Sequence, residues 1–195
     1  MKYSQRYTTL TREELIAKVQ TQMSAKRFRH VLGVEEAALV LADRYGCSLE
    51  KASIAALTHD YAKERSDQEF EQVIRRDGFD LNLLQWGNEI WHGFVGANFV
   101  QRELAIDDPE ILQAIRLHTT GAAAMSLLAK IIYVADYIEP GRNFPGVEQA
   151  RQIALTDLDQ AVAYETKHTL AHLIAKEVPI YPQTIETYNK WVAKK

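Results

Sequence analysis

The most constraining feature of this sequence is the spacing of its apolar residues, which recur three and four positions apart along most of the chain. Two clear examples are the runs Leu15, Ile16, Val19, Met23 and Leu127, Ile131, Val134, Ile138. Because an α-helix turns once in about 3.6 residues, this spacing gathers apolar side chains on one helical face. The alternating pattern that is typical of half-buried strands is scarce. The sequence therefore predicts an all-α fold.

Local signals for the starts and ends of helices agree with this prediction. Capping-box pairs occur at Thr11–Glu14 and Ser66–Glu69, and the Asp108–Pro109 pair suits a helix start with proline at its first position. Expected helix ends are Gly46, Gly78, the Pro140–Gly141 pair and Pro179. Gly33 does not fit, because it lies inside the helical pattern from Lys26 to Tyr45.

Composition narrows the class of protein. A chain of 195 residues that is 47% hydrophobic can bury a sizeable core, and it shows no repeat or linker, so one domain is expected. A formal net charge of -3 argues against a nucleic-acid or membrane partner. The start is too polar for a signal peptide, and no apolar run is long enough for a bilayer. Cys47 is the only cysteine, and we interpret it as a small buried hydrophobe. A cytoplasmic location is expected.

The histidines are the first candidates for a functional site. Four of the six, His30, His59, His92 and His118, lie on different predicted helices or helix ends. Only the packing of a helical bundle could bring such residues together. His59 and Asp60 are adjacent, so their side chains point about 100° apart and suit an ion held between helices. A semi-buried histidine beside a chance aspartate is the alternative.

Two further patterns point in opposite directions. Asp136 interrupts the apolar segment KIIYVADYI, where a carboxylate is costly unless it is paired or bound to a cation. An outward position on an amphipathic helix would also explain it.

His168 and His172 have the spacing of zinc-binding histidines, but Thr169 stands where the HExxH motif has its glutamate. We expect these two histidines to be a solvated or semi-buried surface pair.

Longer segments carry a family resemblance. His30 in RFRHVLGV, the His59–Asp60 pair in THDYAK and Asp136 in YVADYIEPGR resemble the H…HD…D signature of the HD-domain metal-dependent phosphohydrolases. The segments WHGFVGA, HTTG, KIIYVADYIEPGR and IYPQTI, in this order, are similar to those of the bacterial YqeK family over nearly the whole chain. The resemblance implies one HD-domain helical bundle over residues 1–195. Its metal-site core would span about 25–140, with C-terminal helices and a nucleotide-contacting turn in 141–195.

The resemblance also implies an activity, the symmetrical hydrolysis of diadenosine tetraphosphate to two ADP. His30, His59, Asp60 and Asp136 are expected to bind the principal divalent ion, for which iron is the first choice and manganese, cobalt and zinc are alternatives. His92 and His118 would bind a second ion or donate to phosphate oxygens, and one ion is preferred because no further carboxylate adjoins them. The expected catalytic residues are Asp60, Lys63, His92 and His118.

Phosphate binding must come from cationic side chains, because the sequence has neither a GxxxxGK[ST] loop nor a GxGxxG turn. Arg27 and Lys63 lie three positions from expected ligands, although ordinary surface charge would explain both. Arg142 offers a planar fork for phosphate, and Glu139 is a candidate to hold it in place. The full expected substrate-binding set is Arg27, His30, Asp60, Tyr61, Ala62, Lys63, His92, His118, Thr119, Asp136, Arg142, Ile180, Tyr181, Gln183 and Thr184.

The segment IYPQTIETYN, residues 180–189, is predicted to be a fixed turn in the nucleotide pocket. Pro179 and Pro182 stop the preceding helix, and Thr184 is predicted to cap a final one. The Tyr181 ring and the Gln183 amide are groups that stack on a purine and bond to it, whereas closing the core is the alternative role.

Other functions stay open from sequence alone, because a fold does not determine its chemistry. They are an HD phosphodiesterase or nucleotidase acting on another nucleotide, a di-iron oxygenase, and a non-catalytic nucleotide-binding module. A homodimer is also left open.

Overall fold

A computed structural model describes residues 1–194 of the protein, and this part of the chain is helical without any strand. The all-α prediction is confirmed. The helices are α1 (Arg12–Gln20), α2 (Ala25–Tyr45), α3 (Leu49–Thr58), α4 (Asp67–Arg76), the 3-10 helix η1 (Leu81–Gln85), α5 (Asn88–Phe94), α6 (Gly96–Leu104), α7 (Pro109–Leu117), α8 (Leu127–Ile138), α9 (Val147–Ala154), α10 (Leu158–Ala175) and α11 (Pro182–Trp191).

Several helices begin or end at the predicted signals. Complete capping boxes open α1 and α4, and Pro109 stands at the start of α7 behind its capping Asp108. Gly46 ends α2 in the left-handed conformation, at φ 70°. The prediction that Thr184 caps the final helix is wrong, because α11 begins at Pro182 with Tyr181 as its N-cap. Proline is favoured there since the first N–H of a helix has no helical partner.

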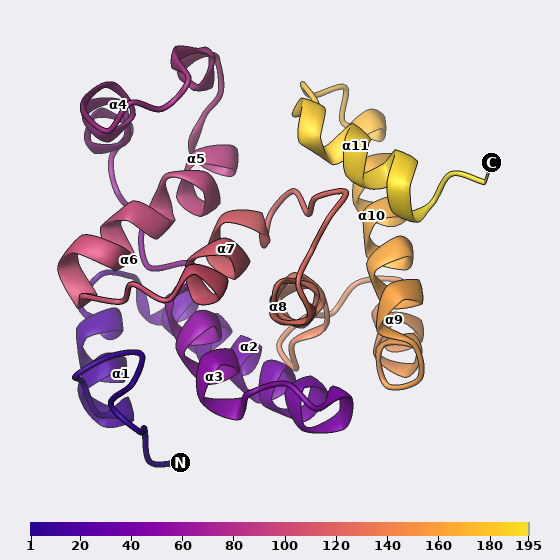
Figure 1. Ribbon diagram of the computed structural model, residues 1–195. Coiled ribbons are helices and arrows are strands. Elements are labelled where there is room, and N and C mark those ends of the chain that lie inside the picture. Colours follow the sequence, from indigo (N-terminus) through magenta and orange to yellow (C-terminus); the bar gives the residue numbers. More distant parts are fainter. Residues whose placement is uncertain (195) are drawn as a thin grey trace.

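Helix α8 forms the centre of the fold. It contacts α2, α7 and α10, and Figure 1 shows it end-on between the N-terminal helices and the group α9 to α11. Leu128, Ile131 and Ile132 of this helix are fully buried, and burial of each contributes about 1.5–3 kcal/mol to folding. Asp136 lies near the end of the same helix and is therefore held by the best-packed element of the core.

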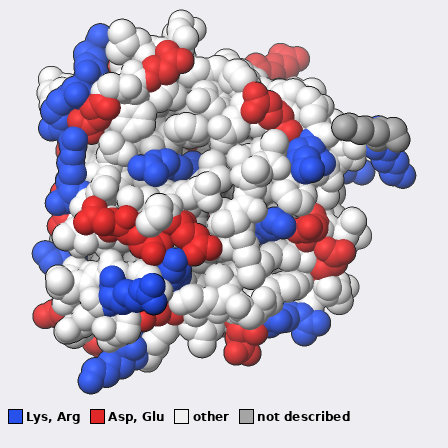
Figure 2. All heavy atoms as spheres, viewed as in Figure 1, with Lys and Arg blue, Asp and Glu red and all other residues white. Residues whose placement is uncertain are grey.

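The surface carries charges of both signs. Figure 2 shows lysine and arginine side chains next to acidic ones on the visible face, without a broad area of one sign. Among residues 1–194, no helix combines the length and apolar character that crossing a membrane requires.

Candidate metal centre and active site

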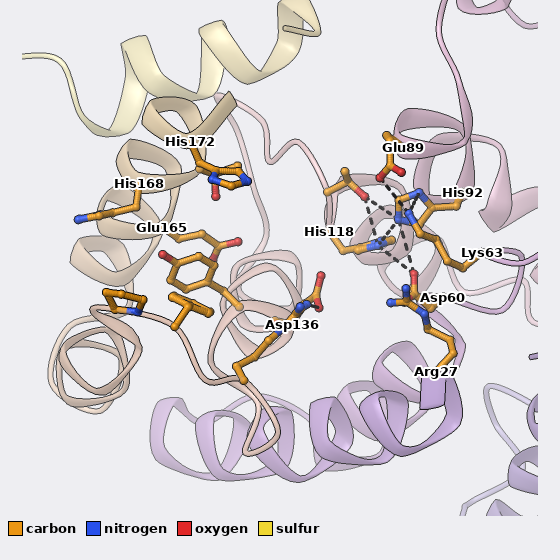
Figure 3. Close-up of a pocket in the computed structure, with 16 residues that line it drawn as sticks. Arg27, Asp60, Lys63, Glu89, His92, His118, Asp136, Glu165, His168 and His172 are labelled. Atoms are coloured by element: carbon orange, nitrogen blue, oxygen red, sulfur yellow. Dashed lines mark hydrogen bonds and ion pairs between the residues drawn. The ribbon is translucent and has the colours of Figure 1, made fainter. Parts of the chain in front are cut away.

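Side chains from different helices converge beside α8 on one polar cluster. Its members are His30 of α2, His59 and Asp60 at the end of α3, His92 of α5, His118 at the end of α7, and Asp136 of α8. His30 and Asp136 are partly buried, and the other members are buried. Figure 3 shows Asp60, His92 and His118 grouped on one side of a pocket with Asp136 facing them. The structure thus brings together all residues that were expected to bind metal.

Asp60 lies at the centre of this cluster. Its Oδ2 atom lies 3.7 Å from His30 Nε2 and 3.5 Å from His59 Nε2. Its Oδ1 atom lies 3.5 Å from His92 Nε2 and 3.7 Å from His118 Nε2. Each carboxylate oxygen therefore faces its own pair of imidazoles, an arrangement that the spacing of these residues in the sequence does not reveal.

The Nδ1 atoms of the four histidines form hydrogen bonds to groups on the side away from Asp60. The acceptors of the Nδ1 atoms are the Ala56 carbonyl for His59 (2.7 Å), the Asn88 carbonyl for His92 (2.6 Å), the Ile115 carbonyl for His118 (2.7 Å) and the Glu139 carboxylate for His30 (3.1 Å). Because backbone carbonyls only accept, Nδ1 carries the hydrogen in His59, His92 and His118, and their Nε2 lone pairs point inward. His30 Nε2 also faces the cluster and lies 3.0 Å from Asp136 Oδ1. Metal-binding histidines are commonly oriented in this way.

The inward-facing atoms fit a divalent cation. His59 Nε2 is buried and has no hydrogen-bond partner in the described chain. His92 Nε2 and His118 Nε2 lie 3.1 Å apart, where two lone pairs repel unless a proton or a cation lies between them. Within residues 1–194, the groups of three residues that could hold an ion all belong to this cluster: His30, His59, Asp60; His59, His118, Asp136; and Asp60, His92, His118. Mixed imidazole and carboxylate donors suit iron, manganese, cobalt or zinc.

The protonation states of Asp60 and His92 also suit a cation. Burial opposes ionisation of Asp60, but the neighbouring His59 and His118 hold the pKa of its carboxyl well below the usual value. Burial, followed by the facing His118 ring, lowers the pKa of His92 to about 3. An ionised carboxylate and neutral imidazoles are the forms that bind metal ions.

The structure explains why a glycine, Gly33, lies inside α2. A Cβ atom at this position would lie 2.5 Å from Glu139 Oε2. Glu139 is buried, contacts His30 Nδ1 through Oε1, and accepts the Gly141 N–H through Oε2 at 2.5 Å. The missing side chain of Gly33 thus lets Glu139 approach α2 and orient the His30 ring.

We expect Gly33→Ala to weaken metal binding by about 10- to 100-fold, the usual cost of losing a group that orients a metal-binding histidine. The new methyl group must displace Glu139, although alanine favours the helix itself by roughly 1 kcal/mol. Competition with a chromogenic chelator measures the affinity. Gly87→Ala is the matched control, because a Cβ atom there meets no atom within 4 Å. Equal affinities in the two variants would contradict this role of Glu139.

Three cations border the cluster, as expected. Arg27 Nη1 donates to Asp60 Oδ2 at 2.8 Å, and Arg142 Nη2 donates to Asp136 Oδ1 at 2.6 Å. Lys63 Nζ donates to Glu89 Oε2 at 3.2 Å. Glu139 Oε1 lies 3.8 Å from Arg142 Nε, so Asp136 rather than Glu139 holds this guanidinium most closely.

A cavity of about 730 Å³ opens onto the cluster, a size typical of small-molecule sites. Arg27, Lys63 and Arg142 contribute to its lining, and so does Thr119, whose hydroxyl lies 3.1 Å from His92 Nε2. The expected anion-binding side chains therefore share one cavity with the histidine cluster.

Other expected substrate-binding residues lie outside that lining. Tyr61 donates its hydroxyl to Glu103, and Ala62 is buried in the core. The C-terminal turn packs on neighbouring loops: the Tyr181 ring lies 5.0 Å from that of Trp86, and Gln183 donates to the Gly121 carbonyl at 2.6 Å. Ile180 and Thr184 belong to the same segment, whose contact with nucleotide stays a prediction.

The opposite wall of the cavity contains residues that sequence reasoning missed. Glu165, His168 and His172 of α10 line it, as do the aromatic residues Tyr137 and Phe144. His168 and His172 are exposed, as expected, and neither belongs to a potential metal group among residues 1–194. The spacing of Glu165, His168 and His172, three and four residues apart on one helical face, was the signal that could have found this wall.

Comparisons with known proteins agree with this geometry. Residues 27–141 match the HD domain family. The symmetrical bis(5'-nucleosyl)-tetraphosphatase of Bacillus subtilis (strain 168) is 48% identical over 180 residues, which cover 92% of this chain and 97% of that protein. The enzyme of the same description from Halalkalibacterium halodurans is 44% identical, over 93% and 97% of the two chains. The crystal structure of an HD superfamily hydrolase from Clostridium acetobutylicum, described as involved in NAD metabolism, superposes with a TM-score of 0.84 at 37% identity, covering 92% of this chain and 95% of that one.

Proposed function

Because the chain belongs to the HD domain family and to its symmetrical bis(5'-nucleosyl)-tetraphosphatases, we propose that it hydrolyses diadenosine tetraphosphate to two ADP. The observation that most supports this function is the position of the buried Asp60. Each of its two oxygens faces a pair of imidazoles, and the residue lies at a cavity that cationic side chains border. Cationic side chains around a cluster of potential metal ligands favour the hydrolysis of a phosphorylated substrate over the oxidation of an uncharged organic one.

We further propose the ligands of the metal centre. His30, His59, Asp60 and Asp136 would hold the principal divalent ion, and iron is the proposed metal. One Asp60 oxygen faces His30 and His59, and the other faces His92 and His118. This arrangement favours a second ion at His92 and His118 over the single ion that the sequence favoured. When bound, such ions polarise phosphoryl oxygens and bring the pKa of a coordinated water toward neutrality.

The cationic side chains would bind and orient the phosphates. Arg27 and Arg142 each pair with a carboxylate of the cluster, so both guanidinium groups lie beside the ions' expected position. There they would neutralise charge that develops on the central phosphates, and Lys63 would hold a flanking one. Positioning the middle of the polyphosphate at the cluster is what makes the cleavage symmetrical.

Three wider features stay predictions. The HD match over residues 27–141 supports the proposed metal-site core, whereas the assignment of residues 1–195 to one domain includes Lys195, outside the described residues. The cytoplasmic location is supported by the lone cysteine. A homodimer also remains a prediction.

We expect hydrolysis of diadenosine tetraphosphate in ¹⁸O-labelled water to yield ADP alone, with the label in one of every two ADP molecules. Attack at a phosphorus beside the central bridge has this outcome, because both halves of the substrate leave as ADP. Liquid chromatography with mass spectrometry separates the products. ATP with AMP, or faster turnover of mononucleotides or phosphodiesters in the same assay, would contradict the proposed reaction.

A further inference from the structure

One side of α10 faces the metal cluster across the cavity. Glu165, His168 and His172 lie on this side and line the cavity wall, and Figure 3 shows them opposite Asp60, His92 and His118. The cluster and its bordering cations account for phosphate binding, but they leave this wall without a role. A substrate with two nucleosides needs a place for each of them.

Glu165 is the least expected residue of the wall. It is only 6% exposed, and its Oε2 atom is buried without a hydrogen-bond partner in the described chain. A buried carboxyl group in this condition lowers the stability of the folded protein. Burial, followed by the charge of Asp136, raises the pKa of Glu165 well above its usual value. The unpartnered Oε2 atom is therefore available to a hydrogen-bonding group of a ligand.

Aromatic side chains line the same cavity as this carboxyl group. The rings of Tyr137 and Phe144 meet edge to face with centroids 4.9 Å apart, and both residues line the cavity. His168 stacks on Tyr164 at 3.9 Å and contacts the Tyr164 carbonyl through Nδ1, so its ring is fixed and its Nε2 is an acceptor. Flat apolar surfaces beside a few oriented polar groups are what a nucleoside site requires.

We propose that the α10 wall, made of Tyr137, Phe144, Glu165, His168 and His172, binds one of the two adenosine groups of diadenosine tetraphosphate. This inference rests on the proposed function. A second cavity of about 730 Å³ also reaches Arg27 and Arg142, but its described lining contains no aromatic side chain, so it suits phosphate better than a base.

The Glu165 carboxyl group suits an adenine base. Adenine presents its N6 amino group as a hydrogen-bond donor, and a carboxyl oxygen accepts from such a group in either protonation state. Loss of this contact is expected to weaken the binding of diadenosine tetraphosphate.

Substitution of Glu165 tests the assignment. We expect Glu165→Leu to raise the KM for diadenosine tetraphosphate about tenfold or more, the usual effect of losing a hydrogen-bonded contact to a base. The kcat and the metal content should stay at wild-type values. Glu165→Gln should keep a KM within about threefold of wild type, because an amide keeps the shape of the carboxyl group and still forms hydrogen bonds to a base.

Stability provides a readout that separates binding from a structural role. The melting temperature of Glu165→Leu should equal or exceed that of wild type, because an apolar side chain replaces an unpartnered buried carboxyl. Lys167→Leu, at an exposed position of α10 outside the cavity lining, is the matched control and should leave KM unchanged. His168→Ala, also exposed, should raise KM in a protein whose folding is undisturbed.

The outcomes separate the two levels of inference. Wild-type turnover combined with an unchanged KM in both Glu165→Leu and His168→Ala would overturn the nucleoside site and leave the proposed function intact. Equal losses of kcat and metal in the leucine and glutamine variants would also overturn it, because Glu165 would then serve the cluster. A wild-type protein that is loaded with metal and does not hydrolyse diadenosine tetraphosphate would refute the proposed function itself.

Discussion

Asp60→Ala is expected to abolish metal binding and to lower kcat by roughly three orders of magnitude or more. Both oxygens of Asp60 face imidazole nitrogens, so its loss removes a donor from each side of the cluster at once. Metal ions contribute several kcal/mol to transition-state stabilisation, and each 1.36 kcal/mol changes the rate about tenfold. Elemental analysis and the rate of ADP formation measure the two effects on the same sample.

Asp43→Ala is the matched control for this substitution, because Asp43 is an exposed aspartate of α2 away from the cavity. It should retain metal and activity. Far-UV circular dichroism should show native helicity in both variants. Stoichiometric metal with a normal rate in Asp60→Ala would refute the assignment of Asp60 as the shared ligand.

Removal of metal by a chelator is expected to abolish activity and to lower the melting temperature by roughly 5–10 °C. An ion that binds only the folded protein at 100 times its Kd contributes about 2.7 kcal/mol. For a chain of this size, each kcal/mol corresponds to about 2–4 °C. The buried and unpartnered Nε2 of His59 would gain a ligand on metal loading, so the folded state should be stabilised.

Thermal unfolding of the chelated protein, repeated after addition of Fe²⁺, Mn²⁺, Co²⁺ or Zn²⁺, measures this shift. Asp60→Ala should show no shift with any of them. An equal shift in wild type and Asp60→Ala would place the stabilising ion elsewhere on the protein. The size of each shift also ranks the four metals, which sequence and geometry leave equivalent.

The fold could be predicted from the sequence because its signals are local. Capping boxes at Thr11 and Ser66 and the glycine at position 46 act within one helical turn, and each lies where it was expected. The start of α11 was misplaced since two competing signals, Pro182 and Thr184, lie two residues apart. Proline at the first helical position prevailed over the hydroxyl cap.

The site was predictable only in part, because its residues are far apart in the sequence. Family resemblance identified the histidines and aspartates, but it did not show that the Asp60 oxygens divide four imidazoles into two pairs. Glu139 was expected beside Arg142, and its Oε1 atom lies 3.8 Å from Arg142 Nε, but packing brings the same oxygen closer to His30 Nδ1, at 3.1 Å. Gly33 carried the relevant signal, since glycine inside a helix costs about 1 kcal/mol and requires a compensating contact.

The α10 wall was missed for a different reason. His168 and His172 have the spacing of a zinc motif without its glutamate, so the sequence predicts a surface pair and no site. Their partner on the helical face, Glu165, precedes His168 by three residues and is buried, which periodicity alone does not reveal. The tertiary position of α10 across from the cluster gives these residues their setting.

The most direct test of the metal centre is a titration of chelated wild-type protein with a divalent ion, in which bound metal and ADP formation are measured together. Diadenosine tetraphosphate is the substrate throughout. We predict that ADP formation is absent from the metal-free protein, rises in step with bound metal until the cluster is filled, and is accompanied by neither ATP nor AMP. Turnover by the metal-free protein, or a rate that does not depend on bound metal, would contradict the assignment of the His30, His59, Asp60 and Asp136 cluster as the catalytic centre.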